Sequence, residues 1–346
     1  MKKRASVFVC FLLVAMLVSC GTAAATNASN PTGTIGMEPL SFTAVDNSMF
    51  DTSDIYCVAY GDGKFIAGGD GGKISYSTDG INWNTVNDSK FDGGSIFDIC
   101  YGDGKFVAVG ESGKIAYSPD GITWTLVAES PFVEIEPGFG SFMTSIETVI
   151  YGNGKYIAGG GANFSIIAHS ADGITWVRPD GVQTFPFTAV GYDGTGNYLA
   201  ISKNGMGAET IVASSPDALT WTDKVNGRYS ERAGIAYGSG RFVYVFNNII
   251  AYSTDGASAH SLANGFTWRN NPPNSVFGQS AITCVTYGRG MFVAGGNDGK
   301  MAHSVNGETW NIIENSAFGT TQINGIAFGD GKFVAVGNGG KIAYSR

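Results

Sequence analysis

Short hydrophobic segments alternate with glycine-rich polar turns along most of the chain. In the first clear example, an apolar-x-aromatic segment ends at Tyr60, the turn Gly-Asp-Gly-Lys follows, and a second apolar segment begins at Phe65. A third segment covers 74–77, and a fourth follows Trp83. Such turns between short segments are typical of β-hairpins, and aromatic and β-branched residues suit a pleated sheet. The pattern predicts a unit of four short strands, which we call A to D.

This unit recurs seven times. The sequence YGDGKFIAGG at Tyr60 returns as YGDGKFVAVG at Tyr101, and further copies start at 151, 192, 237, 287 and 328, at spacings of 41, 50, 41, 45, 50 and 41 residues. A period of this length indicates a repeat architecture, and the small residues near the centre of each repeat suit blades that converge on an axis. We therefore expect an all-β, seven-bladed β-propeller with insertions in the two longer intervals.

The last repeat is incomplete, and the N-terminal segment supplies what it lacks. The chain stops at Ser345-Arg346, after strand C, while the segment 42–50 (FTAVDNSMF) matches 83–91 (WNTVNDSKF) at an offset of 41 residues. We expect this segment to form strand D of the seventh blade, which leaves no open sheet edge between the first and last blades. Residues 37–346 then form one domain.

The first residues have the parts of an export signal. Three positive residues at 2–4 precede an uncharged apolar stretch over 5–18, which is too short to span a bilayer. The sequence LVSCG at 17–21 resembles the lipobox of bacterial lipoproteins, which implies that Cys20 becomes the mature N-terminus and carries lipid. We expect a signal peptide over 1–19, a flexible tether over 20–36 and a place at the outer membrane or cell surface, held by several acyl chains.

Composition narrows the classes of partner. Removal of the signal leaves 18 of the 21 basic residues against 29 acidic ones, a net charge of −11. An acidic protein without basic clusters is a poor candidate for binding nucleic acid or anionic lipid, so we expect membrane contact through the lipid anchor only. Cys57, Cys100 and Cys284 are an odd number in the mature repeats, and we expect them to be small buried residues without disulfides.

A Ser-x-Asp-Gly-x-x-Trp motif follows strand C in most repeats. Its members are Asp79 and Trp83, Asp120 and Trp124, Asp172 and Trp176, Asp217 and Trp221, and Trp310, whose repeat has Asn306 in the Asp position. The motif resembles the Asp-box of sialidase-like (BNR) propellers, although it is one residue shorter between Ser and Trp. The resemblance implies a structural turn in which the carboxylate caps N–H groups and the Trp packs beneath. A feature that recurs in many blades needs a repeated cause, which argues against catalysis.

Departures from the repeat mark the candidate binding site. The loops from strand D of one blade to strand A of the next, the D-to-A loops, lie on the face that propellers usually use for binding, which we call the D-to-A face. The longest covers 125–147, the loop between blades four and five has the densest charge cluster, and Asp98 stands where other blades have small residues. Because the blades are repeats, a specific partner has to contact the loop residues that differ from one blade to the next. The ligand-binding candidates are Asp98, Glu134, Glu136, Glu147, Arg228, Tyr229, Glu231, Arg232, Phe91 and Phe132.

Two of these assignments have structural alternatives. Asp98 either contacts a ligand at the channel mouth or accepts hydrogen bonds from loop N–H groups. Phe91 and Phe132 belong to a series with one aromatic in each D-to-A loop, which either anchors the loop by packing or forms a rim that stacks on sugars or peptides. The insertion 257–266, with His260, lies on the opposite face and would be the binding region if the D-to-A face were not.

Tests for known enzyme chemistry mostly fail. The Phe-Arg-Ile-Pro context of sialidases is absent, and no HExxH, paired CxxC, P-loop or nucleophile elbow occurs, so we expect no metal and no cofactor. We expect a binding or scaffold module for a glycan or protein partner. The chain also resembles Asp-box propellers that act as assembly factors for membrane complexes, an analogy of fold alone. The alternative function is a glycan-cleaving hydrolase that uses two loop carboxylates ~6.5–9.5 Å apart.

Overall fold

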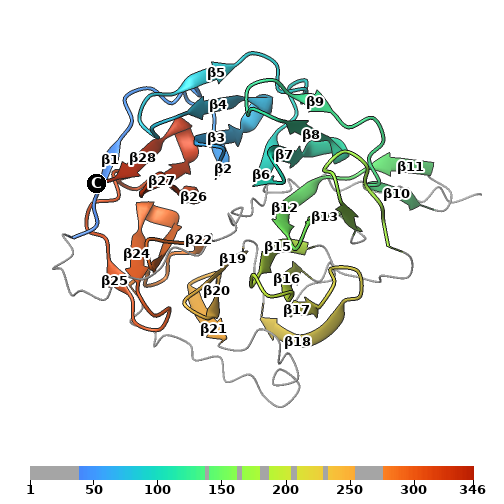
Figure 1. The fold of residues 1–346 in the computed structure, drawn as a ribbon. Coiled ribbons are helices and arrows are strands. Elements are labelled where there is room, and N and C mark those ends of the chain that lie inside the picture. The colour runs from blue at the N-terminus through green and yellow to red at the C-terminus, as the bar shows by residue number, and fades with distance from the viewer. Residues whose placement is uncertain are drawn as a thin grey trace, which may run out of the picture.

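The computed structural model describes residues 39–136, 140–161, 166–179, 187–203, 209–228, 233–253 and 276–346. Over these residues, seven antiparallel sheets stand in a ring around a central axis (Figure 1). The helical structure of the described part is limited to short 3-10 turns at Asp70–Gly72, Glu111–Gly113, Asn297–Gly299 and Asn338–Gly340. The predicted all-β, seven-bladed propeller is confirmed.

In each blade, strand A lies nearest the axis and the other strands follow outward (Figure 1). Blade one comprises β2 (Ile55–Gly61), β3 (Lys64–Gly69), β4 (Ile74–Ser77) and β5 (Asn84–Val86). Blade two comprises β6 (Ile96–Gly102), β7 (Lys105–Gly110), β8 (Ile115–Ser118) and β9 (Thr125–Leu126). Blade three comprises β12 (Ile146–Gly152), β13 (Lys155–Gly160) and β14 (Ile166–Ser170), and an isolated bridge joins His169 of β14 to Val177. Blade four comprises β15 (Phe187–Tyr192), β16 (Tyr198–Lys203), β17 (Glu209–Ser215) and β18 (Thr222–Arg228).

The remaining blades complete the ring. Blade five comprises β19 (Ala233–Gly238), β20 (Arg241–Phe246) and β21 (Ile249–Ser253). Blade six comprises β22 (Ile282–Gly288), β23 (Met291–Gly296), β24 (Met301–Ser304) and β25 (Asn311–Ile312). Blade seven comprises β26 (Ile323–Gly329), β27 (Lys332–Gly337), β28 (Ile342–Ser345) and β1 (Phe42–Ala44). One further hairpin, β10 (Val133–Glu136) with β11 (Gly140–Met143), lies in the D-to-A loop between blades two and three.

The N-terminal strand closes the ring, as the sequence match predicts. Strand β1 pairs antiparallel with β28, with Phe42 opposite Ser345. Side chains also join the last blade to the first: Asn324 Nδ2 donates to the Ile55 carbonyl oxygen at 2.8 Å, and the Gly339 N–H donates to Asp54 Oδ1 at 2.8 Å. Backbone pairing and hydrogen bonds between blades therefore both fasten the closure.

The aromatic residue that ends strand A packs on a glycine of the preceding blade. A Cβ added to Gly61 would lie 2.0 Å from Cγ of Tyr101, closer than any real contact. The same relation holds for Gly102 with Tyr151, Gly152 with Tyr192, Gly238 with Tyr287, Gly288 with Phe328 and Gly329 with Tyr60. The recurring aromatic-Gly pair in the sequence is therefore a blade-to-blade contact as well as the start of a turn.

The three cysteines of the repeats, Cys57, Cys100 and Cys284, are buried free thiols, as expected. Burial raises the pKa of the Cys57 and Cys100 thiols, and the negative charge of Asp98 raises them further. Along the described ranges, no helix is long and apolar enough to cross a bilayer. The predicted signal peptide, anchor residue Cys20 and tether lie outside the described residues.

Candidate functional site

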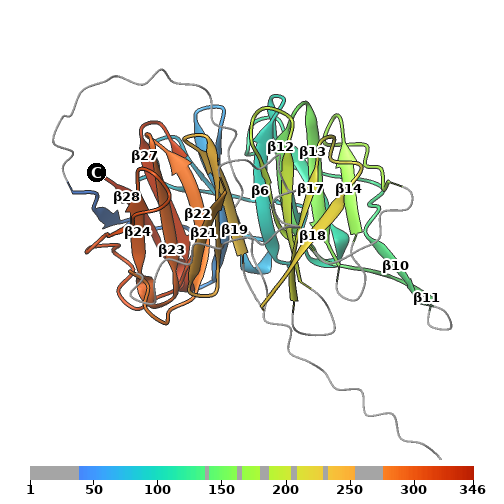
Figure 2. The same cartoon turned by 90° about the horizontal axis from the view of Figure 1, so that it is seen from below.

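Hydrogen bonds from lysines at the start of strand C tie the D-to-A loops to the B-to-C turns. The Lys73 ammonium donates to the Phe50 carbonyl oxygen at 3.1 Å, and Lys114 donates to that of Phe91 at 2.7 Å. Lys300 with Phe277 and Lys341 with Phe318 repeat the contact at 2.9 Å. The D-to-A loops and B-to-C turns therefore share one face, and the A-to-B hairpins and Ser-x-Asp turns lie at the other end of the strands (Figure 2).

The Ser-x-Asp turns are held by their own side chains. In the turn 170–176, Asp172 Oδ1 accepts hydrogen bonds from the N–H groups of Ile174 and Thr175 at 2.8 and 2.7 Å, and Trp176 Nε1 donates to the Gly173 carbonyl oxygen. The bonds from Thr175 and Ile174 lower the pKa of Asp172 to about 2. Asn306 accepts the same two backbone bonds in its turn at 2.9 Å. This geometry is the structural turn that the sequence predicts for Asp79, Asp120 and Asp217 as well.

Asp98 is fully buried and does not reach a ligand at the channel mouth. Its Oδ1 accepts from the Ile99 N–H at 2.9 Å, and its Oδ2 accepts from the Val149 N–H of blade three at 2.8 Å. A carboxylate that joins two neighbouring inner strands in this way satisfies backbone groups that have lost water. Its assignment as a ligand-binding residue is therefore corrected in favour of the structural alternative.

The aromatic residues of the D-to-A loops do not form an exposed rim. Phe91 and Phe132 have no exposed surface, and Phe50, Phe277 and Phe318 in the corresponding positions are equally buried. Each packs inside a blade core, because the loop has to be anchored in every repeat. The assignment of Phe91 and Phe132 as ligand-stacking residues is corrected, and the packing alternative holds for these five positions.

The other candidates are only partly placed. Glu147 is half-buried on β12, and Glu134 and Glu136 lie on β10 of the hairpin that projects from the ring (Figure 2). The register sets Glu134 opposite Phe142. The side chains of Glu134, Glu136 and Arg228, and the residues Tyr229, Glu231, Arg232 and His260, lie outside the described part. The structure therefore brings none of these charges together into a measured site.

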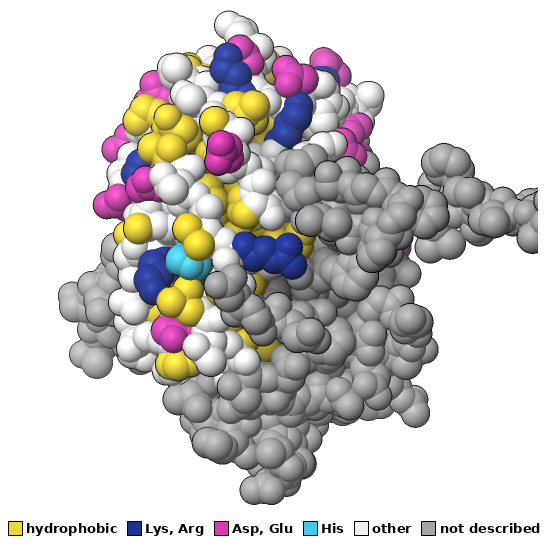
Figure 3. All heavy atoms as spheres, turned by 90° about the vertical axis from the view of Figure 1, so that its right-hand side faces the viewer, with side chains coloured by type: hydrophobic (Ala, Val, Ile, Leu, Met, Phe, Trp, Pro, Cys, Tyr) yellow, Lys and Arg dark blue, Asp and Glu magenta, His cyan; other side chains and the backbone are white. Residues whose placement is uncertain are grey.

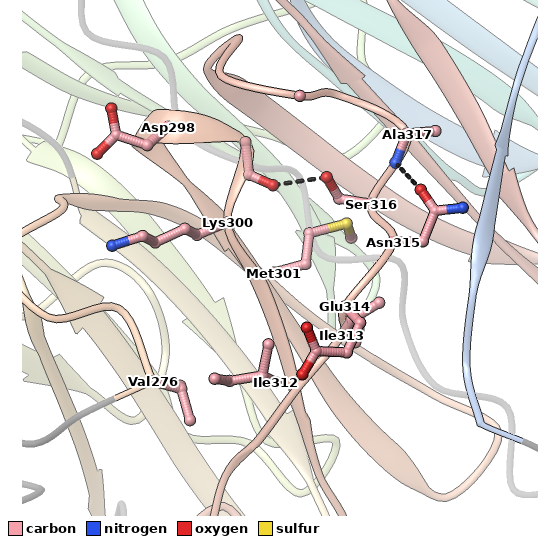
Figure 4. A pocket seen from close by; sticks show the side chains of 12 residues that line it. Val276, Asp298, Lys300, Met301, Ile312, Ile313, Glu314, Asn315, Ser316 and Ala317 are labelled. Carbon is pink, nitrogen blue, oxygen red and sulfur yellow. Dashed lines mark hydrogen bonds between the residues drawn. The ribbon is translucent and has the colours of Figure 1, made fainter.

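Blade six has a pocket on the D-to-A face that sequence reasoning missed. It has a volume of about 300 Å³ and lies between the loop that enters the blade and the loop that leaves it (Figure 4). Met301 and Ile313 are buried beneath it, and Val276, Ile312 and Ala317 complete its apolar surface. The polar lining residues are Asp298, Lys300, Glu314, Asn315 and Ser316.

A small residue explains why blade six has this space. Ala317 directly precedes the loop anchor Phe318, and the same position holds Met49, Lys90 and Pro131 in other loops. Met49 packs against the corresponding apolar cluster of its own blade. With only a methyl group at 317, that volume stays empty. Comparing 310–318 with 42–50 and 83–91 position by position would have revealed the signal.

The outer rim of blades two and three carries several exposed apolar side chains (Figure 3). Ile122, Leu126, Ile174 and Val177 are 39–51% exposed. Single exposed apolar residues are ordinary on protein surfaces, so we assign no site to this rim. Among the described residues, no three His, Cys, Asp or Glu side chains are grouped so that they could hold a metal ion.

Comparison with known proteins finds the same fold in solved structures. No protein-family model matches the chain, and no curated protein matches it. A structure of YCF48 bound to a D1 peptide is 16% identical with a TM-score of 0.65, covering 90% of this chain and 96% of that one. A catalytically inactive virginiamycin B lyase from Staphylococcus aureus with quinupristin is 11% identical, with a TM-score of 0.65 and coverage of 88% and 99%. The WD40 propeller of Doa1 is 14% identical, with a TM-score of 0.57 and coverage of 89% and 96%. At these identities the likeness extends to the fold, and the chain is a seven-bladed β-propeller.

Proposed function

We propose that the protein is an exported, lipid-anchored propeller whose D-to-A face binds a segment of a protein partner. The observation that carries the choice of a protein over a glycan is the burial of the loop aromatics. With Phe50, Phe91, Phe132, Phe277 and Phe318 inside the blade cores, these loops offer no ring face for a sugar to stack on. The same face has a pocket with an apolar floor, which suits a protein side chain.

Two further points support a binding role. YCF48 has this fold and is seen with a peptide, so the architecture is compatible with peptide binding, although this is an analogy of fold. The hydrolase alternative loses support because the buried Asp98 carboxylate cannot contact a substrate, which removes one of the candidate acids. The resemblance to the Asp-box propellers that act as assembly factors agrees with a scaffold for a membrane complex.

Blocking one face at a time tests the proposal. Asp92→Cys places a thiol on the D-to-A face and Asp103→Cys places one on an A-to-B turn of the opposite face; both positions have positive φ, and their native side chains are 80% and 59% exposed. The native thiols of the repeats are buried, and Cys10 and Cys20 are replaced by Ser in both variants, so a polyethylene glycol maleimide modifies the introduced thiol alone. Each labelled full-length protein is then presented to a phage-displayed peptide library and to a glycan array.

We expect the parent to retain peptides, the label at 92 to abolish retention and the label at 103 to leave it unchanged. The opposite pattern would place the site on the other face. Retention of glycans without peptides would contradict the choice of partner.

The anchor is tested separately. Cys20→Ala should lose metabolic palmitate label and leave the membrane fraction, because the lipid-carrying thiol is gone. Cys10→Ala, within the predicted signal, is the matched control and should keep both the label and the membrane location. Unchanged labelling of Cys20→Ala would show that the lipoprotein assignment is wrong.

A further inference from the structure

We infer that the blade-six pocket is a subsite for one apolar side chain of the partner segment, and that a lysine or arginine lies next to that side chain. This inference rests on the proposed function, because it names the chemistry of the segment that the D-to-A face would bind. The pocket is defined by Val276, Met301, Ile312, Ile313 and Ala317, with Asp298, Lys300 and Glu314 among its polar residues (Figure 4).

The apolar floor of the pocket suits an apolar side chain, and its mouth is polar. A volume of about 300 Å³ is at the small end of the range for ligand pockets. Met301 and Ile313, 2% and 4% exposed, form its floor, and the 53% exposed Ile312 extends the apolar surface at the mouth. An apolar group placed against Ile312 would cover apolar surface that water now contacts, which is favourable.

Three polar contacts of the inner pocket wall are made within the protein. Ser316 Oγ donates to the Gly299 carbonyl oxygen at 2.6 Å, and the Ala317 N–H donates to Asn315 Oδ1 at 3.1 Å. The Asn315 carbonyl oxygen accepts from the Phe42 N–H of the closing strand at 3.0 Å. Because burying an unpaired polar group is costly, these internal bonds let the inner wall at Ser316 and Ala317 accept an apolar group.

The charges at the rim favour a cation beside the apolar group. Lys300 donates its ammonium to the Phe277 carbonyl oxygen at 2.9 Å, and in Figure 4 its amine points away from Ala317 and Met301. Asp298 is exposed and accepts one bond from Ser280 Oγ, and the exposed Glu314 makes no hydrogen bond or ion pair with the part of the chain that is described. Two carboxylates against one engaged lysine give a negative rim, which complements a basic residue of the partner.

Filling the pocket is the direct test, and the chain shows that it can be filled without distorting the loop. Ala317 has φ +65°, while Met49 and Lys90 occupy the same loop position at +68° and +70°. Ala317→Met therefore introduces a side chain that another blade already accepts there. Lys90→Met makes the matching change at the same loop position between blades one and two and leaves the pocket open. Melting curves of both variants should match that of the parent.

Peptides selected from a phage library on the full-length parent are measured against both variants. We expect those that carry an apolar residue next to lysine or arginine to bind Ala317→Met roughly tenfold or more weakly. Lys90→Met should bind them as the parent does. Glu314→Gln should weaken the binding of these peptides by a few-fold at low salt. The loss should disappear at high salt, because salt screens an exposed charge contact.

The outcomes distinguish the subsite, its basic neighbour and the proposed function. Equal binding by the parent and Ala317→Met, or selection of acidic peptides at the pocket, would overturn the subsite and leave the proposed function standing. Selection of no peptide on the parent would overturn both. Loss in Ala317→Met with none in Glu314→Gln would retain the apolar subsite and overturn the basic neighbour.

Discussion

Several buried or turn polar side chains of this propeller form hydrogen bonds with backbone groups. Asp98 accepts N–H bonds from two inner strands, Asn324 joins blade seven to blade one, and Asp172 caps its turn. In each case a carboxylate or amide pairs with backbone that the strand ladders do not satisfy, as buried and turn backbone requires. An Asp or Asn whose side-chain polar atoms already form hydrogen bonds with the backbone cannot be assigned a chemical role from its residue type alone.

The turn carboxylates should make stability depend on acid pH. The folded-state pKa of Asp172, about 2, lies below the ~3.9 of an unfolded aspartate. The contribution of this carboxylate is therefore complete above the unfolded pKa and is lost as the pH falls through the folded one. Asp172→Ala should lower the free energy of unfolding by about 1 kcal/mol at pH 7 and by less near pH 2.

Asp172→Asn is the control for this prediction. It should stay close to the parent at pH 7, because Asn306 makes the same backbone bonds in blade six. Urea unfolding of all three proteins at both pH values gives the comparison. An Asp172→Ala deficit that is the same at both pH values would show that the carboxylate charge contributes nothing.

Asp98→Ala should act through stability and not through binding. The variant leaves the Ile99 and Val149 N–H groups without this buried acceptor, which costs about 2–5 kcal/mol in total. Asp98→Asn keeps an acceptor and should lose less. Urea unfolding measures the loss, and peptide retention per folded molecule should equal that of the parent. Weaker retention with an unchanged unfolding midpoint would return Asp98 to the list of ligand contacts.

At the scale of strands, the blades are spaced by glycines that admit a neighbour's aromatic ring. Gly61, at the end of β2, lies against Tyr101 at the end of β6, and the relation repeats around most of the ring. Blade four departs from it: Asp193 takes the glycine position and caps the turn that follows, accepting from the N–H groups of Thr195 and Asn197. The strand ends therefore set the approach of adjacent sheets.

Gly61→Ala should be among the most damaging small substitutions in the protein. Its Cβ would lie 2.0 Å from the Tyr101 ring, so the two blades would have to separate, at a cost of more than about 3 kcal/mol. Gly63→Ala is the matched control, because open space surrounds its Cβ and only its φ of +69° is unfavourable, which costs about 1–2 kcal/mol. Urea unfolding of both variants measures the difference, and equal losses would contradict the contact.

At the scale of the whole molecule, the ring depends on its first residues. Strand β1 covers the outer edge of β28, and the N–H of Phe42 reaches Asn315 in the loop leaving blade six. An uncovered edge offers unpaired backbone groups to other chains. The N-terminal segment therefore links blades six, seven and one.

Deleting residues 37–52 should cause aggregation or a markedly lower melting temperature, because it removes β1 and the Phe50 anchor. Deleting residues 21–36, the predicted tether, should leave the melting temperature unchanged and serves as the control. Circular dichroism melts and light scattering provide the measurements. A 37–52 deletion that melts with the parent would show that closure contributes nothing to stability.

The sequence by itself determined the blade count, the strand order, the turns after strand C and the closing strand. These features come from contacts within one repeat, or from a match between repeats, so a 41-residue period and its Gly, Asp and Trp positions are enough to predict them. The tertiary structure decided what Asp98, Phe91 and Phe132 do. Asp98 accepts a hydrogen bond from Val149, which lies 51 residues away in the sequence. The loop aromatics are buried in cores built from several segments. The pocket exists because Ala317 leaves unfilled a space bounded by strands and loops distant along the chain, and only the tertiary structure brings those walls together.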